Sequence, residues 1–370
     1  MKNKLIKFLG AFLILAVGAF YGCDQPLDTN NADQPEEQTL NNGDPIPDQY
    51  IVVFKDNNTQ GKVAKVNAVR SKVLSENSIA KERVLSEYNR ALQGFTAKLD
   101  KDQVEKLRLD KRVDYIEQDR VITLAPPGAC SPWPGCRDDD EEDDGGDDGG
   151  DSNQTTPYGI TRVGGPVASS GTAWVIDSGI DLDHPDLNVD TDRSAVFVSR
   201  GPGSGTPDDG NGHGTHVAGT IAALDNDIDV VGVAAGASVV AVKVLDDRGS
   251  GSYSNVINGI DYVASNASAG DVANMSLGGG TSDAVDDAVR NAADQGILFS
   301  IAAGNSSDDA NNYSPARVEY NNVWTVSAID DTDTFASFSN YSGPTDPPIE
   351  FAAPGVRYLS LWAEWRNKHD

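Results

Sequence analysis

From Gln154 onward the chain alternates between short apolar runs and longer segments with helical spacing, and this alternation strongly constrains the fold. The apolar runs predict strands at 173–177, 238–245, 272–276, 297–303, 323–329 and 349–352. The segments between them predict helices at 213–224, 253–267 and 283–295. Apolar strands joined by helices indicate an α/β fold with a parallel sheet covered on both faces. In such sheets, functional groups gather at the carboxyl ends of the strands.

A second pattern, made of smaller elements, precedes the first. It predicts strands at 50–55, 83–88, 95–99 and 113–124, with helices at 61–77 and 101–109. Asp100 stands where the N-cap of the second helix is expected. The order strand, helix, strand, strand, helix, strand is that of ferredoxin-like α+β domains. We therefore expect a small α+β domain over residues 49–124, ahead of the α/β domain over residues 154–370.

The N-terminus predicts export. Three lysines within the first seven residues precede the apolar run 8–20, which is typical of a signal peptide over residues 1–22. A short membrane anchor is the alternative, although the run is short for a membrane span. Gly22 and Cys23 resemble a bacterial lipoprotein processing site, but the aromatic residues at positions 20 and 21 differ from that pattern. The sequence predicts a secreted protein and leaves open a lipid anchor at Cys23.

Two segments predict linkers. Residues 23–48 contain few apolar residues and predict a flexible tether. Residues 138–151 hold ten acidic residues and four glycines, and they predict a disordered acidic linker within 125–153. Loose calcium binding by these acidic residues is the weaker alternative. Outside the cell, Cys130 and Cys136 could close a small disulfide loop.

The charge balance excludes some classes of partner. The chain has 29 basic and 57 acidic residues, which gives a formal net charge of -28. Nucleic acids and anionic membranes bind to basic surfaces, so neither is expected as a partner. The acidity fits either a self-repelling soluble surface or a salty medium that screens the charges.

Three polar residues stand at the ends of predicted elements. Asp177 ends a strand and is placed to orient another side chain, although Asp-Ser-Gly is also common as a cap or turn. His213 begins a helix and can act as a general base. A packed histidine, or a metal pair with His216, is the alternative, but no HExxH pattern supports a zinc site. The amide of Asn305 could donate to a developing oxyanion, or the residue could simply tolerate a tight turn.

Six motifs occur in the order found in one family: Val175–Ile180, His184–Leu187, His213–Gly219, Asn274–Gly279, Ala303–Asn305 and Ala353–Gly355. In these motifs the chain resembles the subtilisin-like serine proteases, and Asn312–Pro315 with Phe338–Tyr341 is similar to the proteinase K branch. The resemblance implies an endopeptidase of broad, apolar-favouring specificity that hydrolyses peptide bonds in proteins. It also implies that Asp177 orients the imidazole, His213 is the base and Asn305 is the oxyanion donor.

The resemblance extends to the substrate cleft and to the smaller domain. It implies that Ser276, Leu277 and Gly278 line the P1 pocket and pair with the substrate backbone along one edge of the cleft. Gly249, Ser250 and Gly251 would form the other edge, so that a peptide is held as an added strand. Residues 49–124 resemble the inhibitor I9 propeptide of the family. Such a propeptide acts as an intramolecular inhibitor and chaperone, and its last strand fills the cleft until it is cleaved near Leu124.

The resemblance also implies a structural calcium ion. The site comprises side-chain oxygens of Gln154, Asp186 and Asn226 and the carbonyl oxygens of Leu224, Ile228 and Val230. Oxygen ligands of this kind suit calcium. An ordinary acidic surface loop is the alternative.

The serine motif of the family, Gly-Thr-Ser-Met-Ala, does not occur in the sequence. Ser360 is the last serine, and it stands in a strand-like run without that motif. We therefore expect an incomplete peptidase domain that is inactive as given and folds poorly unless completed, as a fragment or a shifted reading frame would be. The alternative is a pseudoenzyme or a protease-inhibitory binding module, and a metal hydrolase is disfavoured.

Overall fold

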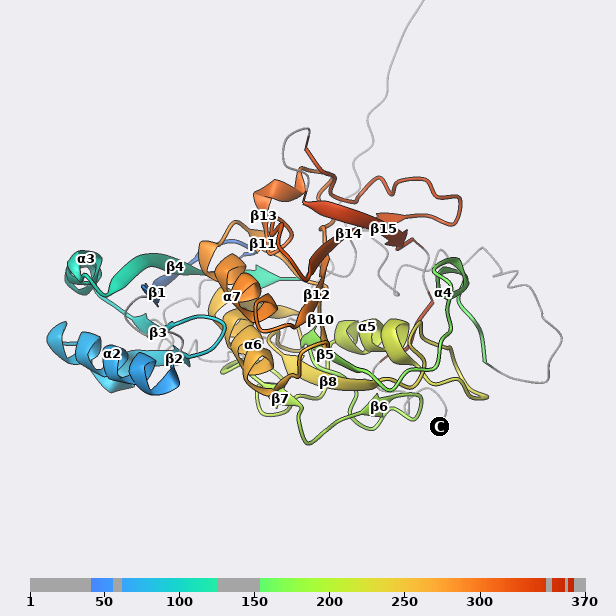
Figure 1. Cartoon of the computed structure of the whole chain (residues 1–370), viewed down its shortest axis with the longest axis horizontal. Helices are drawn as coiled ribbons and strands as arrows, with labels where there is room; N and C mark the ends of the chain where they lie inside the picture. The colour runs from blue at the N-terminus through green and yellow to red at the C-terminus, as the bar shows by residue number, and fades with distance from the viewer. Residues whose placement is uncertain (1–40, 56–61, 125–153, 344–347, 357–358, 363–370) are drawn as a thin grey trace, which may run out of the picture. The chain divides into compact units, whose positions relative to one another are not determined.

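The computed structural model describes residues 41–55, 62–124, 154–343, 348–356 and 359–362 (Figure 1). The predicted signal peptide, the lipidation of Cys23, the Cys130–Cys136 disulfide and the acidic linker lie outside these residues, as does most of the predicted tether. Part of the tether prediction is wrong, because the first strand begins at Pro45 and not at Tyr50. Among the helices of the described residues, none combines the length and the apolar character that crossing a membrane requires.

Residues 41–124 form the N-terminal module. Its elements are β1 (Pro45–Phe54), α2 (Val63–Glu76), the 3₁₀ turn η1 (Lys81–Arg83), β2 (Val84–Tyr88), β3 (Gly94–Lys98), α3 (Lys101–Leu109) and β4 (Val113–Thr123). The strands pair antiparallel in the order β2-β3-β1-β4. The predicted order of elements is thus confirmed. Asp100 caps α3 in a capping box with Gln103, as the sequence predicts.

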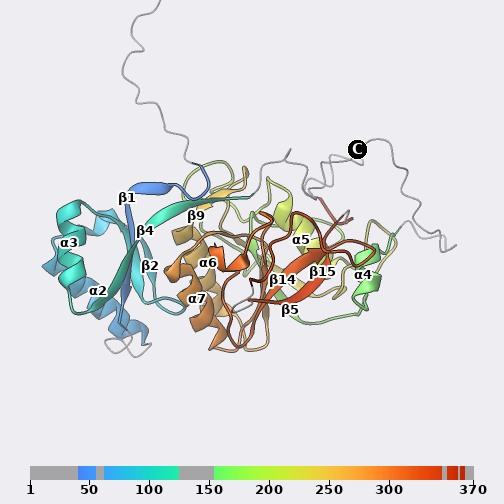
Figure 2. The same cartoon turned by 90° about the horizontal axis from the view of Figure 1, so that it is seen from above.

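The two faces of the module's sheet pack against different partners. Val52 and Phe54 of β1 point into a core with α2 and α3. Ile51 and Val53, one residue out of phase, belong to a second core that contains residues of α6 (Tyr253–Asn266) and α7 (Asp283–Ala293). Because side chains alternate along a strand, one strand serves both cores. Figure 2 shows α2 and α3 on one side of this sheet and α6 and α7 on the other.

Residues from 154 onward form the main domain. Its strands are β5 (Thr172–Asp177), β6 (Asn188–Val189), β7 (Ala195–Val196), β8 (Ser238–Lys243), β9 (Ser250–Ser252), β10 (Val272–Met275), β11 (Gly279–Gly280), β12 (Leu298–Ala302), β13 (Tyr313–Ser314), β14 (Val323–Ile329) and β15 (Ile349–Pro354). Its helices are α4 (Tyr158–Arg162), α5 (His213–Ala222), α6, α7 and the 3₁₀ turn η2 (Ala310–Asn312). The main sheet has the order β15-β14-β12-β10-β5-β8-β6, and β7 also pairs with β8. These strands all pair parallel.

Helices cover both faces of this sheet, as predicted. Trp174 and Ile176 of β5 pack in the core that holds α6 and α7. Ala173 and Val175 of the same strand pack in a core with α5. Strand β5 is therefore buried on both sides, which explains why its sequence is continuously apolar. Its carboxyl end, at Asp177, lies in the middle of the sheet between β10 and β8.

Candidate active site

Asp177 and His213 meet at the carboxyl end of β5. Asp177 is the last residue of the strand and is fully buried. His213 is the first residue of α5, and its Nδ1 lies 2.7 Å from Oδ1 of Asp177. The same Asp177 oxygen accepts a hydrogen bond from the backbone N–H of Ser178 at 2.7 Å. The strand end and the helix start thus place a carboxylate where it can fix the tautomer and the orientation of the imidazole.

The surroundings of His213 favour its protonated form. Burial disfavours the charged ring, but the negative charge of Asp177, the hydrogen bond to it and the charge of Asp209 outweigh burial and raise the pKa of His213. A general base must hold a proton during the reaction and release it later. A carboxylate against Nδ1 stabilises this protonated state and leaves Nε2 as the atom for exchange with a reacting group.

Asn305 lies at the same edge of the sheet, after β12, two strands away from β5. Its side chain is exposed. The preceding Gly304 has a φ of 104°, which favours glycine. The buried side chain of Asn340 holds the turn, because it donates to the carbonyl of Ala303 at 2.9 Å and accepts from the N–H of Ser306 at 2.8 Å. Asn340 is thus a supporting residue that sequence reasoning did not single out within its Phe-Ser-Asn-Tyr motif.

One predicted cleft edge is paired with the N-terminal module. Val121–Thr123 of β4 pair antiparallel with Ser250–Ser252 of β9. The pairing continues to Leu124, whose N–H donates to the carbonyl of Gly249 at 2.9 Å. The predicted edge Gly249–Gly251 is therefore the segment on which the last strand of the module lies.

The other predicted edge follows β10. Leu277 is buried, and Ser276 accepts a hydrogen bond through Oγ from the side chain of Asn274 at 2.9 Å. Gly278 lies against the backbone carbonyl of Ser314, so a larger side chain there would have little room. The two edges follow β8 and β10, the two strands that flank β5 in the main sheet.

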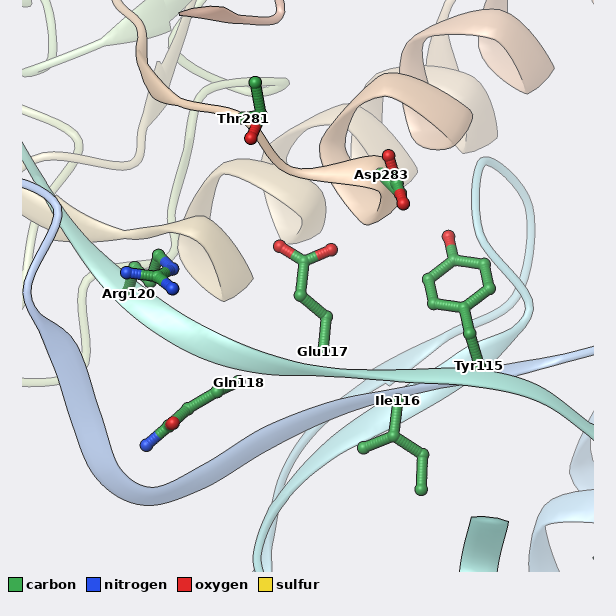
Figure 3. Close-up of a pocket in the computed structure, with 7 residues that line it drawn as sticks. All are labelled: Tyr115, Ile116, Glu117, Gln118, Arg120, Thr281 and Asp283. Atoms are coloured by element: carbon green, nitrogen blue, oxygen red, sulfur yellow. The ribbon is translucent and has the colours of Figure 1, made fainter. Parts of the chain in front are cut away.

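Carboxylates of β4 contact the N-termini of two helices of the main domain. Figure 3 shows Glu117 pointing from β4 toward Thr281 and Asp283 at the start of α7, across a pocket lined also by Tyr115, Ile116, Gln118 and Arg120. Oε2 of Glu117 accepts the N–H of Ala284 at 3.1 Å. Oδ1 of Asp119 accepts the N–H of Ser254, in α6, at 3.1 Å. Negative charge at a helix N-terminus is favourable, so these contacts bind the module to the domain.

The predicted calcium ligands lie close together. The side-chain nitrogen of Gln154 lies 2.8–3.2 Å from four oxygens: the carbonyls of Leu224, Ile228 and Val230 and Oδ1 of Asn226. The side-chain nitrogen of Asn226 lies 2.6 Å from Oδ1 of Asp186. Oδ2 of Asp186 is buried, and none of the described residues donates a hydrogen bond to it. Burial raises the pKa of Asp186 to about 7.

This arrangement fits a cation. An orphaned carboxylate oxygen beside three inward-pointing carbonyls is an unfavourable arrangement that a calcium ion would relieve. Among the described residues there is no cluster of three or more histidine, cysteine, aspartate or glutamate side chains that could hold a metal. The oxygens that converge on Gln154 are mainly backbone and amide oxygens, which calcium accepts and transition metals do not prefer.

Ser360 is not placed as a partner of His213. Its Oγ donates to the backbone carbonyl of His216 at 2.7 Å and also accepts a hydrogen bond from Thr220 at 3.1 Å. The prediction that it stands in a strand is wrong, because residues 359–362 form no regular element. The next residue, Leu361, is 3% exposed and packs with the core below α5, so this segment is held by packing and not by sheet pairing.

Two protein-family models match the chain. The model of the subtilase family matches residues 174–368, and the model of the peptidase inhibitor I9 family matches residues 49–125. The chain is 38% identical over 329 residues to alkaline serine exoprotease A of Vibrio alginolyticus, covering 86% of this chain and 56% of that protein.

The chain covers a larger share of two further relatives. Proteinase R of Parengyodontium album is 35% identical over 86% of this chain and 74% of that protein. Subtilisin NAT of Bacillus subtilis subsp. natto is 37% identical over 84% of this chain and 72% of that protein. On these matches, the chain belongs to the subtilase family of serine proteases and carries an inhibitor I9 propeptide domain.

Proposed function

We propose that the chain is the precursor of a secreted, calcium-binding serine endopeptidase, in which Asp177, His213 and Asn305 have the roles expected from the family. The 2.7 Å contact between His213 Nδ1 and Asp177 Oδ1 carries this proposal. Asp177 holds the ring, Nε2 of His213 takes the proton of a serine hydroxyl and returns it to the leaving amine, and Asn305 donates to the oxyanion. Export is supported by relatives that are named as extracellular proteases, such as the extracellular serine proteinase of a Thermus species.

The N-terminal module acts as the intramolecular inhibitor in this proposal. A substrate held as an added strand would pair with Gly249–Gly251, and β4 already pairs with this segment. Cleavage after β4 would leave the module bound through the β4–β9 ladder and the carboxylates at α6 and α7. Release of the module would then open the cleft to protein substrates.

Calcium would be held by Gln154, Asp186 and Asn226 and by the carbonyls of residues 224, 228 and 230. When bound, the ion would neutralise Asp186 and tie the segment before α4 to the loop that follows α5. The contribution would be to stability, since the cluster involves neither Asp177 nor His213.

The serine motif of the family does not occur within the 370 residues. We therefore propose that this polypeptide does not hydrolyse peptide substrates by itself. In a subtilisin, loss of the serine alone lowers kcat by about 10⁶-fold, as much as loss of the whole triad. Turnover by this mechanism would require a serine hydroxyl within reach of Nε2 of His213.

The test compares the 370-residue polypeptide with a chimera in which a serine-bearing C-terminal segment of another subtilase follows Gly355. We expect hydrolysis of a chromogenic peptide and labelling by a serine-directed phosphonate only in the chimera, and we expect His213→Ala to abolish turnover but not folding. Phosphonate-sensitive turnover by the polypeptide itself would show that another serine serves. A folded chimera that binds peptides without cleaving them would instead identify a binding module.

A further inference from the structure

Helix α5 starts at the histidine, but its own sequence offers no N-cap. The residue before His213 is Gly212, with a φ of 100° and no side chain to cap the helix. The first turn of α5 also contains no acidic residue. The first backbone N–H groups of a helix have no acceptor within the helix, so acceptors from elsewhere have to satisfy them.

The carboxylate of Asp209 supplies one of these acceptors and also holds the backbone that leads into the helix. Asp209 is 3% exposed and lies in the loop before α5. Its Oδ1 accepts the N–H of Gly212 at 2.9 Å and that of Asn211 at 3.0 Å. Its Oδ2 accepts both the N–H and the hydroxyl of Thr215, at 2.9 and 2.7 Å. One buried carboxylate therefore holds the backbone on both sides of His213.

Ser178 joins this carboxylate to the strand that carries Asp177. The hydroxyl of Ser178 donates to Oδ1 of Asp209 at 2.9 Å and accepts the N–H of Gly214 at 3.0 Å. Ser178 is the residue directly after Asp177. The contacts of Asp209 and Ser178 thus connect the last residue of β5 to the first turn of α5 without passing through the imidazole.

Close backbone packing at this junction leaves little room for the end of β5 and the start of α5 to move relative to each other. A Cβ atom on Gly214 would collide with the carbonyl oxygen of Gly179. The helix start therefore lies directly on the turn after β5, and a small shift of either segment would change the Asp177–His213 distance. Misplacement of a catalytic group by about 1 Å can lower the rate by about 100-fold.

We propose that Asp209, acting with Ser178, is a positioning residue that fixes His213 relative to Asp177 by holding the first turn of α5 against the end of β5. Its negative charge also acts on the ring, since Asp209 is one of the groups that raise the pKa of His213. The inference rests on the proposed role of His213 as the base and adds a second carboxylate to the site.

The test is NMR of the full chain labelled with ¹⁵N-histidine, because the four histidines give few signals and the readout needs no turnover. In Asp209→Asn we expect the pKa of His213 to fall, because a nearby negative charge is lost. We also expect the Nδ1–H proton that is shared with Asp177 to broaden or move upfield. Ser178→Ala, which keeps every charge, is expected to perturb that proton while changing the pKa less.

The matched control is Asp100→Asn, which changes another capping aspartate, at α3, to its amide. It should leave the His213 signals unchanged. If Asp209→Asn and Ser178→Ala lower the melting temperature but leave both the pKa and the Nδ1–H signal of His213 as they are, Asp209 is only a helix cap and the proposal fails.

In the serine-bearing chimera, Asp209→Asn should lower kcat about tenfold or more with little change in KM, the pattern for a group that acts in the transition state. An increase in KM alone would contradict the proposal. The chimera could also fail to cleave peptides while its His213 signals respond to Asp209→Asn as expected. This outcome would support the positioning role of Asp209 and contradict the peptidase function.

Discussion

Helix α5 lies on one face of the parallel sheet and helices α6 and α7 lie on the other, and their N-termini are held from different parts of the chain. At α5, the buried carboxylate comes from Asp209 of the main domain. At α7 and α6, carboxylates come from Glu117 and Asp119 of the N-terminal module, beside the domain's own caps Ser282 and Ser252. If the propeptide is cleaved and released, as proposed, the groups that hold the histidine would stay with the domain, whereas some of the groups at α6 and α7 would leave with the propeptide.

The difference separates two requirements. If the module is removed on maturation, as proposed, the geometry at His213 has to persist without it. The acceptors supplied by Ser178 and Asp209 at the start of α5 belong to the main domain. The face formed by α6 and α7 has to be stable both with and without the module, which explains why these helices keep serine caps of their own.

The largest effect on stability is expected in the core that the N-terminal module shares with α6 and α7. Tyr88 is fully buried there, and its hydroxyl lies 2.7 Å from Oγ1 of Thr96. Tyr88→Ala should lower the free energy of unfolding by about 3–5 kcal/mol, as large cavities in cores do. Tyr88→Phe, which keeps the ring, should lower it by about 1 kcal/mol. Urea unfolding of the full chain measures both changes. If Tyr88→Ala lowers the free energy of unfolding by less than Tyr88→Phe does, the module does not share this core.

A carboxylate of the domain also holds the module. Oδ1 of Asp261, in α6, accepts the N–H groups of Asn89, Arg90 and Ala91 at 3.1, 2.7 and 2.8 Å. Asp261→Ala should cost about 1.5–3 kcal/mol of stability, the range for hydrogen bonds to a charged group. The exposed Asp331 is the control, since its replacement by alanine should change the stability by no more than about 0.5 kcal/mol. Equal effects of the two variants would show that the loop 89–92 is not held by this carboxylate.

Calcium binding should distinguish the two faces of the sheet, because the ion would stabilise only the side that carries α5. Burial raises the pKa of Asp186 to about 7 from 3.8, so the calcium-free fold loses stability as the pH rises through this range. Calcium offsets that loss by binding the carboxylate, and below about pH 7 it has to displace a proton, which lowers its apparent affinity by up to about tenfold per pH unit. The increase in melting temperature on exchanging EGTA for calcium should therefore be larger at pH 8 than at pH 5.

Asp186→Asn is the control for this measurement, since it removes the titrating group. In this variant the calcium effect should be small at both pH values. A calcium effect in the unaltered chain that is the same at pH 5 and pH 8 would exclude Asp186 as a ligand.

The smallest effect is expected at α7. Glu117 caps Ala284 through Oε2, while none of the described residues donates a hydrogen bond to its buried Oε1, and burial raises its pKa. Glu117→Ala should cost about 1 kcal/mol, as the loss of a helix cap does. Glu117→Gln keeps an acceptor and removes a buried charge, so it should be nearly neutral. If the glutamine variant is as unstable as the alanine variant, the charge itself and not the hydrogen bond secures α7.

The parts of the fold that could be predicted from the sequence are those with strong periodicity. The apolar run before Asp177 predicts a strand buried on both faces, and Asp100 predicts the start of α3 to the residue. Segment β9 could not be predicted by periodicity, because its three residues include a glycine and its pairing with β4 joins segments far apart in the sequence. Its importance came from the family resemblance alone.

The candidate site divides in the same way. Asp177 and His213 stand at the ends of regular elements, where sequence patterns indicate chemistry. Asp209 stands in a loop rich in glycine and aspartate, which predicts only a solvated turn, and its partners Ser178 and Thr215 come from separate segments. Asp261 similarly reads as part of the polar stripe of a surface helix, because the backbone that it binds lies about 170 residues earlier. Such contacts depend on tertiary packing, which local patterns do not report.

The ladder between β4 and β9 has one more consequence. It extends the sheet of the module into the main domain, in the order β2-β3-β1-β4-β9. An unpaired sheet edge presents free N–H and C=O groups and promotes aggregation by pairing with other chains. Because β4 and β9 satisfy each other within one polypeptide, newly made molecules do not expose these two edges to one another. If the module is removed, as proposed, β4 and β9 would both lose this pairing in the same step.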